Sequence, residues 1–293
     1  MFSNNKGLFK EAKAARYLPN FILAPILVIV FFILGEIPGE LLNSFIISSN
    51  VSPSIAMLSN LICGFLFVSL IIFIWVRFVE KRKVSSMGFY KESFIKKFFT
   101  GFLIGLIMFS LVTALLFVTG HITINNNPTS AVGLSALSSI LIVLPGWIIQ
   151  SATEEIATRG WLMNVLGARY NVFLGLLISS TLFGILHLAN PNVSVVAILN
   201  IILVGIFFGF YVIKTKNLWG ACGLHAAWNW AQGNIFGFEV SGLKIQIGSL
   251  IHLKLKGADW FTGGAFGPEA GIAATIVLLT GIIIVFFMLR KDN

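Results

Sequence analysis

The amino-acid sequence predicts an all-α protein, a polytopic membrane bundle of about eight transmembrane helices, and composition is the first evidence. Apolar residues make up 57% of the 293 positions, against about 45–50% in soluble domains. Charged residues make up only 11%, less than half of the roughly 25% that is usual. So few charges cannot solvate a surface of this size. This excludes a disordered chain, a fibrous repeat and an ordinary cytosolic enzyme.

The second observation is the length of the apolar segments. A helix needs about 20 mostly apolar residues to cross a bilayer. Eight segments meet this requirement, namely 18–35, 54–76, 98–119, 133–153, 171–188, 194–213, 218–236 and 271–289. The fourth has Pro145-Gly146 in its middle, so we expect a kink or a break there, packed against neighbouring helices. The seventh is the richest in small residues, which favours close packing inside the bundle.

Basic residues lie between the apolar segments in short clusters, and these clusters predict the topology. If the N-terminus is cytoplasmic, 17 of the 20 lysines and arginines fall on the cytoplasmic side. The other three, Lys244, Lys254 and Lys256, lie in the loop before the last segment. Because cytoplasmic loops carry an excess of Lys and Arg, we expect both termini in the cytoplasm. The clustering also argues against a nucleic-acid partner, despite the formal net charge of +9.

These observations predict how the chain is organised. Residues 1–17 form a basic cytoplasmic segment, 18–289 a single transmembrane bundle and 290–293 a cytoplasmic tail. The first apolar segment is long and no small-residue cleavage pattern follows it, so we interpret it as a retained span rather than a signal peptide. We therefore expect a multi-pass integral membrane protein surrounded by the lipid bilayer, in the plasma membrane if its source is bacterial.

Ionisable groups at membrane depth are the informative residues, because each costs about 2.5–3.5 kcal/mol at a helix centre. Most acidic residues fall in loops or near predicted span ends, and the exceptions are Glu154 and Glu155, at the inner end of the fourth segment. Glu155 and Arg159 share a helix face and can form an ion pair. Glu154 projects about 100° away, where an unpaired buried carboxylate suits a general base. Two glutamates at a snorkelling helix end, balanced by Arg159, remain the structural alternative.

Two histidines also lie within predicted spans. His187 is near the outer end of the fifth segment, and Phe183 lies four residues before it on the same face. His225 and Asn229, in the seventh segment, place an imidazole and a carboxamide on one face, where they can polarise a carbonyl or stabilise an oxyanion. Each also has a structural interpretation, as a hydrogen-bonded core histidine and as an interhelical hydrogen-bonding pair.

Other catalytic chemistries fit the sequence less well. The chain has only two aspartates, Asp259 in a loop and Asp292 at the C-terminus, so intramembrane catalysis by two aspartates is excluded. No histidine is followed by glutamate, which excludes an H-E-x-x-H zinc helix. Ser135 lies in a weak Gly-x-Ser pattern with no histidine helix paired to it. Cys222, among small residues, is a packing residue by type, and with Cys63 it gives no disulfide framework.

Three motifs follow one another on successive core segments: Glu154-Glu155-x-x-x-Arg159, Phe183-x-x-x-His187 and His225-x-x-x-Asn229. In this order and spacing they resemble the CAAX protease and bacteriocin-processing (CPBP, or Abi) family of intramembrane endopeptidases. The resemblance covers the fourth to seventh segments, about 133–236, which is under half of the chain. Residues 263–269, just before the last segment, are similar to a stretch common among bacterial members.

The resemblance implies an intramembrane protease with a cavity inside a helical bundle. In such a protein Glu154 and His187 would activate the attacking water, and His225 and Asn229 would stabilise the oxyanion. The resemblance further implies three supporting residues: Glu155, Arg159 and Phe183. The implied partner is a membrane-associated protein or peptide, cleaved at a CAAX-type tail or in a leader or signal peptide. One tension is that Glu154 is predicted near the inner face and His187 near the outer end of its span.

Two questions stay open from the sequence. Glu154, His187 and His225 could hold zinc or another divalent metal, as in a metalloprotease, or they could act without metal through the carboxylate base. The protein could also be a non-catalytic immunity or regulatory scaffold of the same fold. A small-solute transporter is disfavoured, because it predicts paired broken helices in two halves, and only Pro145 marks such a break.

Overall fold

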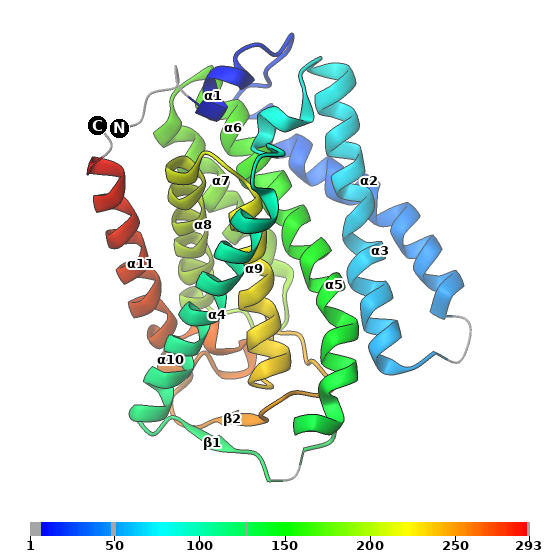
Figure 1. Cartoon of the computed structure of the whole chain (residues 1–293), viewed down its shortest axis with the longest axis vertical. Helices are drawn as coiled ribbons and strands as arrows, with labels where there is room; N and C mark the ends of the chain where they lie inside the picture. The colour runs from blue at the N-terminus through cyan, green and yellow to red at the C-terminus, as the bar shows by residue number, and fades with distance from the viewer. Residues whose placement is uncertain (1–6, 48–50, 127, 292–293) are drawn as a thin grey trace.

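The computed structural model describes residues 7–47, 51–126 and 128–291. In this part of the chain the fold is a helical bundle with one small two-stranded sheet at an end of the bundle (Figure 1). In the sheet, β1 (Ile122–Ile124) pairs antiparallel with β2 (Leu253–Leu255), and Ile122 lies opposite Leu255. The predicted all-α membrane fold is confirmed.

The helices follow the chain in the order α1 (Gly7–Ala12), α2 (Leu23–Ile47), α3 (Pro53–Ile74), α4 (Phe94–Val118), α5 (Leu137–Glu155), α6 (Asn164–Arg169), α7 (Val172–Leu186), α8 (Val195–Thr215), α9 (Trp219–Trp230), α10 (Asp259–Thr262) and α11 (Ile272–Lys291). Among the described residues, 7 helical stretches are long and apolar enough to cross a membrane. The protein is therefore a multi-pass integral membrane protein. The seventh predicted segment, 218–236, is not among these 7 stretches but is also helical: α9 continues as the π-helical segment Ala231–Ile235, and α9 is short and almost wholly buried.

Helix α9 packs against α4 with their backbones in contact. A methyl group added at Gly101 of α4 would lie 1.8 Å from the carbonyl oxygen of Gly220, and one added at Gly223 of α9 would lie 2.2 Å from that of Phe98. Only glycine permits this approach, which is typical of helices packed inside membranes. The small residues of the seventh predicted segment thus hold the helix that carries His225 and Asn229.

Helix α5 does not end where the sequence analysis placed it. It continues through the π-helical segment Ile156–Met163 into α6, so that Gly133–Arg169 forms one helical stretch of 37 residues. Glu154 and Glu155 therefore lie near the middle of this stretch, and their predicted position at an inner helix end was wrong. Of the kink or break expected at Pro145, the break is absent, because α5 stays helical through this residue. The main irregularity is the π-helical segment just after the two glutamates.

Helix α2 is longer than predicted as well. It runs from Leu23 to Ile47 with Pro38 inside it, so Glu36 and Glu40 lie within a membrane-spanning helix. Glu154 and Glu155 are thus not the only acidic residues in the spans, and the sequence analysis was wrong on this point. The side chains of Glu36 and Glu40 are exposed on the helix surface.

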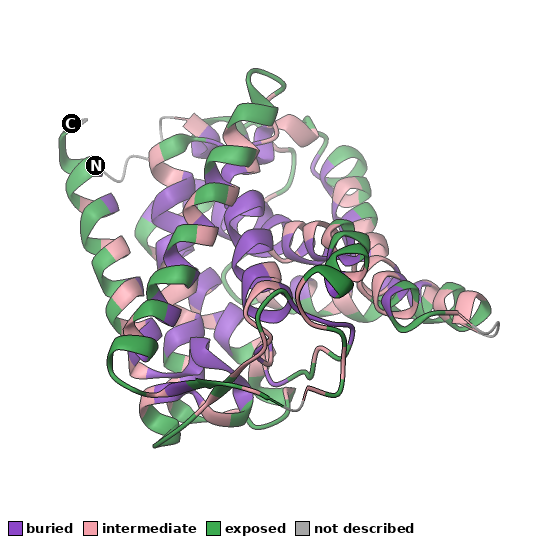
Figure 2. Cartoon of the chain, turned by 60° about the horizontal axis from the view of Figure 1, so that its bottom comes forward, coloured by how far each residue is buried: buried purple, intermediate pink, exposed green. Residues whose placement is uncertain are grey.

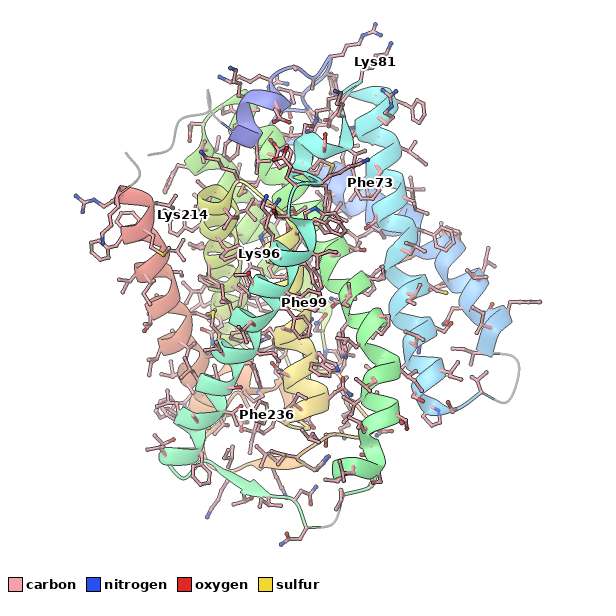
Figure 3. All side chains as sticks on the ribbon, in the orientation of Figure 1. Phe73, Lys81, Lys96, Phe99, Lys214 and Phe236 are labelled. Atoms are coloured by element: carbon pink, nitrogen blue, oxygen red, sulfur yellow. The ribbon has the colours of Figure 1, made fainter. Side chains whose placement is uncertain are left out.

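The buried residues lie in the middle of the bundle, and exposed residues cover its outer helices (Figure 2). Many exposed side chains are large and apolar, for example Phe99 on α4, which is 62% exposed and is labelled in Figure 3. Such a surface suits lipid rather than water. Helix α1 and the last turns of α11 lie at the same end of the bundle (Figure 1), and Lys81 lies at that end too (Figure 3). Which side of the membrane this end faces stays a prediction.

Candidate active site

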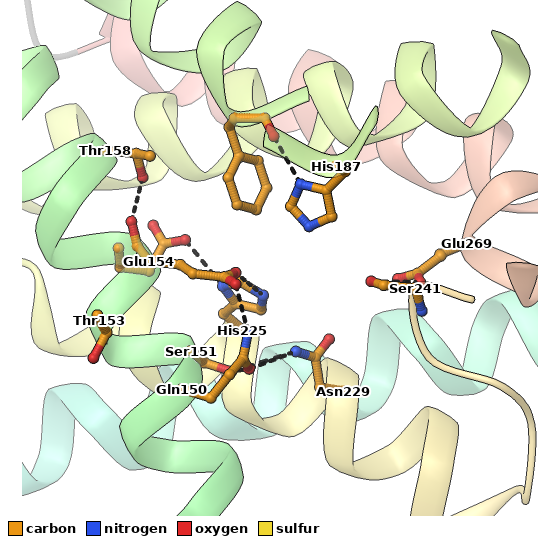
Figure 4. Close-up of polar contacts among 12 residues, drawn as sticks. Gln150, Ser151, Thr153, Glu154, Thr158, His187, His225, Asn229, Ser241 and Glu269 are labelled. Atoms are coloured by element: carbon orange, nitrogen blue, oxygen red, sulfur yellow. Dashed lines mark hydrogen bonds and ion pairs between the residues drawn. The ribbon is translucent and has the colours of Figure 1, made fainter. Parts of the chain in front are cut away.

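A cavity of about 350 Å³ lies inside the bundle and brings together side chains from distant parts of the chain. Its polar lining consists of Glu36, Gln150, Glu154, Thr158, His187, Asn190, His225, Asn229, Ser241 and Glu269, and its apolar lining includes Phe32, Met57, Leu61, Phe65, Trp147, Leu186, Ile201, Val204 and Phe208. Many of the polar members appear together in Figure 4. Glu154, His187, His225 and Asn229, predicted from three separate motifs, therefore share one cavity.

Glu154 is held by the preceding turn of its own helix. The Gln150 amide nitrogen donates a hydrogen bond to Glu154 Oε1 at 2.7 Å. The other carboxylate oxygen, Oε2, lies 3.6 Å from Nε2 of His225. This distance is too long for a hydrogen bond but close enough for an ion pair. The Glu154 side chain is 13% exposed, so one carboxylate oxygen has a partner and the other faces the cavity beside an imidazole.

Glu155 and Arg159 form a fully buried ion pair. Nη1 of Arg159 donates to Glu155 Oε1 at 2.9 Å, and both side chains are 0% exposed. The same oxygen lies 3.0 Å from Nδ1 of His225. Because a carboxylate only accepts hydrogen bonds, Nδ1 of His225 carries a proton here, and Nε2 is left for Glu154 and the cavity. The contact between Glu155 and His225 is new relative to the sequence analysis, and it links the first motif to the third.

Phe183 lies at the centre of the cluster and explains why an aromatic residue precedes His187 by one turn. The guanidinium carbon of Arg159 lies 4.4 Å from the centroid of the Phe183 ring, a cation–π arrangement. The same ring meets His187 edge-on at 4.8 Å and His225 at 6.0 Å between centroids. Phe183 is 2% exposed. One aromatic ring thus keeps the guanidinium and both imidazoles in place.

His187 caps the C-terminal end of α7, begins the short 3-10 helix His187–Ala189, and is half-buried. Its Nδ1 lies 2.7 Å from the Phe183 carbonyl oxygen. Because a carbonyl only accepts, Nδ1 carries the proton, and in the neutral ring Nε2 is an acceptor. In Figure 4 the ring stands between Glu154 and Glu269. The sequence analysis placed Glu154 near the inner face and His187 near the outer end of its span. These two positions no longer conflict, because Glu154 lies near the middle of the helical stretch Gly133–Arg169.

Asn229 completes the predicted set. Its side-chain nitrogen donates to Gln150 Oε1 at 3.0 Å, and Ser151 Oγ donates to the same oxygen. Gln150 therefore bridges Glu154 on one side and Asn229 on the other. The same nitrogen of Asn229 also donates to Ser151 Oγ over a longer distance of 3.5 Å.

Sequence reasoning missed several polar residues of the cavity. Gln150 could have been found, because it lies four residues before Glu154 and so shares its helix face. Ser241 and Asn190 lie in loops, where no periodicity marks a position. Glu269 belongs to a stretch that the sequence analysis noted, but its carboxylate was given no role.

The metal question can be tested on the arrangement of the side chains. Among the described residues, no three His, Cys, Asp or Glu side chains are grouped so that they could hold a metal ion. Glu154 and His225 lie near one another, but His187 does not complete a set with them. As arranged, these residues do not fit a zinc site with three protein ligands. The minor candidates are elsewhere: Ser135 is exposed, and Cys63 and Cys222 are buried free thiols.

The fold and the cavity define a class of protein, an integral membrane protein with a polar site enclosed by its helices. Comparison with known proteins agrees: residues 135–231 match the family model described as Rce1-like, type II CAAX prenyl endopeptidase. The resemblance to this protease family is thereby confirmed for that segment, and the family supports a CAAX-type intramembrane protease.

A curated relative has also been found. The uncharacterised protein YyaK of Bacillus subtilis (strain 168) is 37% identical over 98 residues. The aligned region covers 32% of this chain and 31% of YyaK. The match is thus limited to about a third of each protein.

Proposed function

We propose that the protein is an intramembrane endopeptidase that hydrolyses a peptide bond of a membrane-associated protein or peptide. The observation that carries this proposal is the convergence of Glu154, His187, His225 and Asn229 on one cavity inside a membrane bundle. The match of residues 135–231 to a protease family supports it. The substrate is a CAAX-type tail or a leader or signal peptide.

Glu154 is the general base in this mechanism. Gln150 fixes Oε1, so Oε2 is the oxygen that accepts a proton from water. The oxygen of that water then attacks the peptide carbonyl carbon and gives a tetrahedral oxyanion. When the bond between carbon and nitrogen breaks, the proton passes to the leaving amine, and a carboxylic acid and an amine are released.

His187 orients and polarises the same water. The bond from its Nδ1 to the Phe183 carbonyl leaves Nε2 as an acceptor towards the cavity. An imidazole with a fixed tautomer and a carboxylate can together hold one water between them. This division of roles needs no group beyond the described side chains, and because they do not fit a metal site, we route no step through a metal.

His225 and Asn229 stabilise the oxyanion. The Asn229 amide, which exchanges its long 3.5 Å contact with Ser151 Oγ for the oxyanion, and Nε2 of a protonated His225 are donors on one face of α9. Glu155 accepts from Nδ1 of His225 and so fixes its ring, while Arg159 balances the charge of Glu155. Loss of one oxyanion donor lowers kcat by about 10²–10³-fold in enzymes that use such a device.

The proposal includes the topology. Residues 1–17 and 290–293 lie in the cytoplasm on either side of the single bundle 18–289, in agreement with the charge distribution. A tag after residue 293 is then digested by protease only in inverted membrane vesicles. Digestion in right-side-out vesicles contradicts this orientation.

The test of function is a cleavage assay on the purified full-length chain in lipid nanodiscs. The probes are a farnesylated peptide that ends in C-a-a-X and its unprenylated counterpart, with new termini detected by mass spectrometry. We expect cleavage by the wild type and none by Glu154→Gln or His187→Ala, with Glu40→Gln as the matched carboxylate control on the surface of α2.

The alternative, a non-catalytic scaffold, has its own signature. A scaffold needs its fold but not its general base. The scaffold is therefore favoured if Glu154→Gln leaves a cellular phenotype of the protein unchanged, while Trp161→Ala, which disrupts the fully buried core, abolishes that phenotype. Wild-type protein that cleaves neither peptide, nor membrane proteins of its own host, also favours the scaffold.

A further inference from the structure

Glu269 is a second buried carboxylate in the cavity, and neither the family motifs nor the proposed mechanism uses it. It lies in the short 3-10 helix Pro268–Ala270, just before α11, and is 8% exposed. Its Oε1 accepts hydrogen bonds from the backbone nitrogen of Ser241 at 2.5 Å and from Ser241 Oγ at 3.1 Å. A buried carboxylate on a cavity wall is costly in a membrane protein and marks a functional group by default.

A chain of hydrogen bonds connects this carboxylate to the turn that carries His187. The Asn190 backbone nitrogen donates to the His187 carbonyl oxygen at 3.1 Å. The Asn190 side chain donates to the Ser241 carbonyl oxygen at 3.0 Å. Ser241 in turn binds Glu269 through its nitrogen and its hydroxyl. The distance between imidazole and carboxylate is therefore set by an ordered network rather than by two free side chains.

Helix α8 and a glycine fix the other side of Glu269. The Asn200 side chain donates to the carbonyl oxygens of Glu269 and Gly271, each at 2.9 Å. Gly267, just before the 3-10 helix, has φ 116°, and a methyl group there would lie 2.3 Å from the Glu239 carbonyl oxygen. Because of this close approach, the 3-10 helix Pro268–Ala270 packs directly against the loop that contains Ser241.

The charges around His187 favour interaction with Glu269. Among the cavity-lining residues there is no Lys or Arg, and the titratable side chains that share the space with His187 are Glu36, Glu154, His225 and Glu269. The nearest guanidinium, that of Arg159, stacks on the Phe183 ring and is not part of the cavity lining. Burial raises the pKa of Glu269, while hydrogen bonds from Ser241 and the charge of His187 lower it.

We infer that Glu269 is a positioning residue for His187, and that its carboxylate, held by Ser241, stabilises the imidazolium that forms when His187 takes up a proton. Glu154 and Glu269 then stand on opposite sides of His187, the first as the base that meets the water and the second as a fixed counter-charge (Figure 4). The kinetic part of this inference rests on the proposed function, but the electrostatic part does not.

The decisive experiment is a titration of His187 by NMR on the full-length chain in nanodiscs, with histidine isotope-labelled at the ring carbon. The chain has only 4 histidines, and His187→Gln identifies the resonance. Glu269→Gln keeps an oxygen acceptor for Ser241 but removes the charge, so we expect the pKa of His187 to fall by about half a unit or more. Glu239→Gln, the same change in the loop of Ser241 but outside the cavity lining, leaves it unchanged.

A second variant covers the case in which Glu269→Gln does not fold. Ser241→Ala removes the hydroxyl donor, so Glu269 holds its proton more tightly and the pKa of His187 falls by a smaller amount. An unchanged His187 titration in a folded variant overturns the inference, whatever the activity. A lowered melting temperature with an unchanged titration assigns Glu269 a merely structural role and overturns it too.

Kinetics then separate this inference from the proposed function. If the wild type cleaves peptide, Glu269→Gln lowers kcat about tenfold and shifts the acid limb of the pH profile to lower pH, with little change in KM. If the wild type cleaves nothing, the proposed function fails, and the NMR titration still decides whether Glu269 governs His187. If Glu154→Gln abolishes cleavage but Glu269→Gln matches the wild-type profile, only the inference fails.

Discussion

The buried pair of Glu155 and Arg159 allows a quantitative prediction about stability. Both side chains are 0% exposed and 2.9 Å apart, so neither charge has access to water. Removal of one partner from such a pair costs about 3–5 kcal/mol, because the remaining charge is left buried and uncompensated. We therefore expect Arg159→Met to lose about this much free energy of unfolding, which corresponds to roughly 6–15 °C in Tm.

The pair also predicts non-additivity. In the double variant Glu155→Gln/Arg159→Met no buried charge is left unpaired within the pair, and the introduced carboxamide still presents an oxygen to His225. The double variant should be more stable than Arg159→Met alone, because the effects of two residues in contact do not add. The control is Arg169→Met, an exposed arginine near the end of the same helical stretch, with an expected change below about 1 kcal/mol.

The chain supplies its own reporter for this measurement. Its two cysteines, Cys63 and Cys222, are buried and free, so a thiol-reactive dye labels them only as the bundle unfolds. Melting curves with this dye give Tm for the wild type, the two single variants and the double variant. Arg159→Met with a Tm as high as that of Arg169→Met would refute the argument, since it would show that Glu155 is not left as an unpaired buried charge.

Three further predictions address the site and its scaffold. Gln150→Leu removes the amide that holds both Glu154 and Asn229, so kcat in the peptide assay should fall about tenfold or more while the fold persists; an unchanged kcat speaks against Gln150 as a support. Chelation with phenanthroline followed by dialysis should leave cleavage intact, since the described side chains do not form a metal-binding set, and activity that is lost and then restored by zinc would contradict this. Gly101→Val should push α4 away from α9 and cost about 1–3 kcal/mol with loss of activity, whereas Gly64→Ala, where an added methyl group meets nothing within 4 Å, should be nearly neutral in the same melting assay.

The membrane spans could be predicted because hydropathy is a local property. The predicted range 194–213 corresponds to α8 (Val195–Thr215), and 271–289 corresponds to α11 (Ile272–Lys291). The error at α5 has a physical cause: charged residues normally mark the end of a span, and Glu154, Glu155 and Arg159 were interpreted in that way. Here packed helices cover every residue of Ile156–Met163, so the helix continues with its charges inside the protein.

The site could be predicted only in part. Residues one helical turn apart, such as Glu155 and Arg159, share a face wherever the helix lies, and so spacing alone predicts their pairing. The contact between Glu155 and His225 depends on how α5 meets α9, and that is a property of tertiary packing. Ser241 and Glu269 are harder still to predict from the sequence, because both lie in irregular segments, where the direction of side chains has no fixed period.

The arrangement of charges in the cluster bears on how the reaction begins. Glu154 and Glu155 carry two potential negative charges, and Arg159 forms its ion pair with Glu155. No Lys or Arg lines the cavity, and a proton on Nε2 of His225, 3.6 Å from Glu154 Oε2, would place a positive charge beside Glu154. When the proton is on His225, Glu154 is free to accept one from water, and His225 is already a donor for the oxyanion. The same proton thus prepares both halves of the proposed chemistry, which gives a physical reason for the contact between α5 and α9.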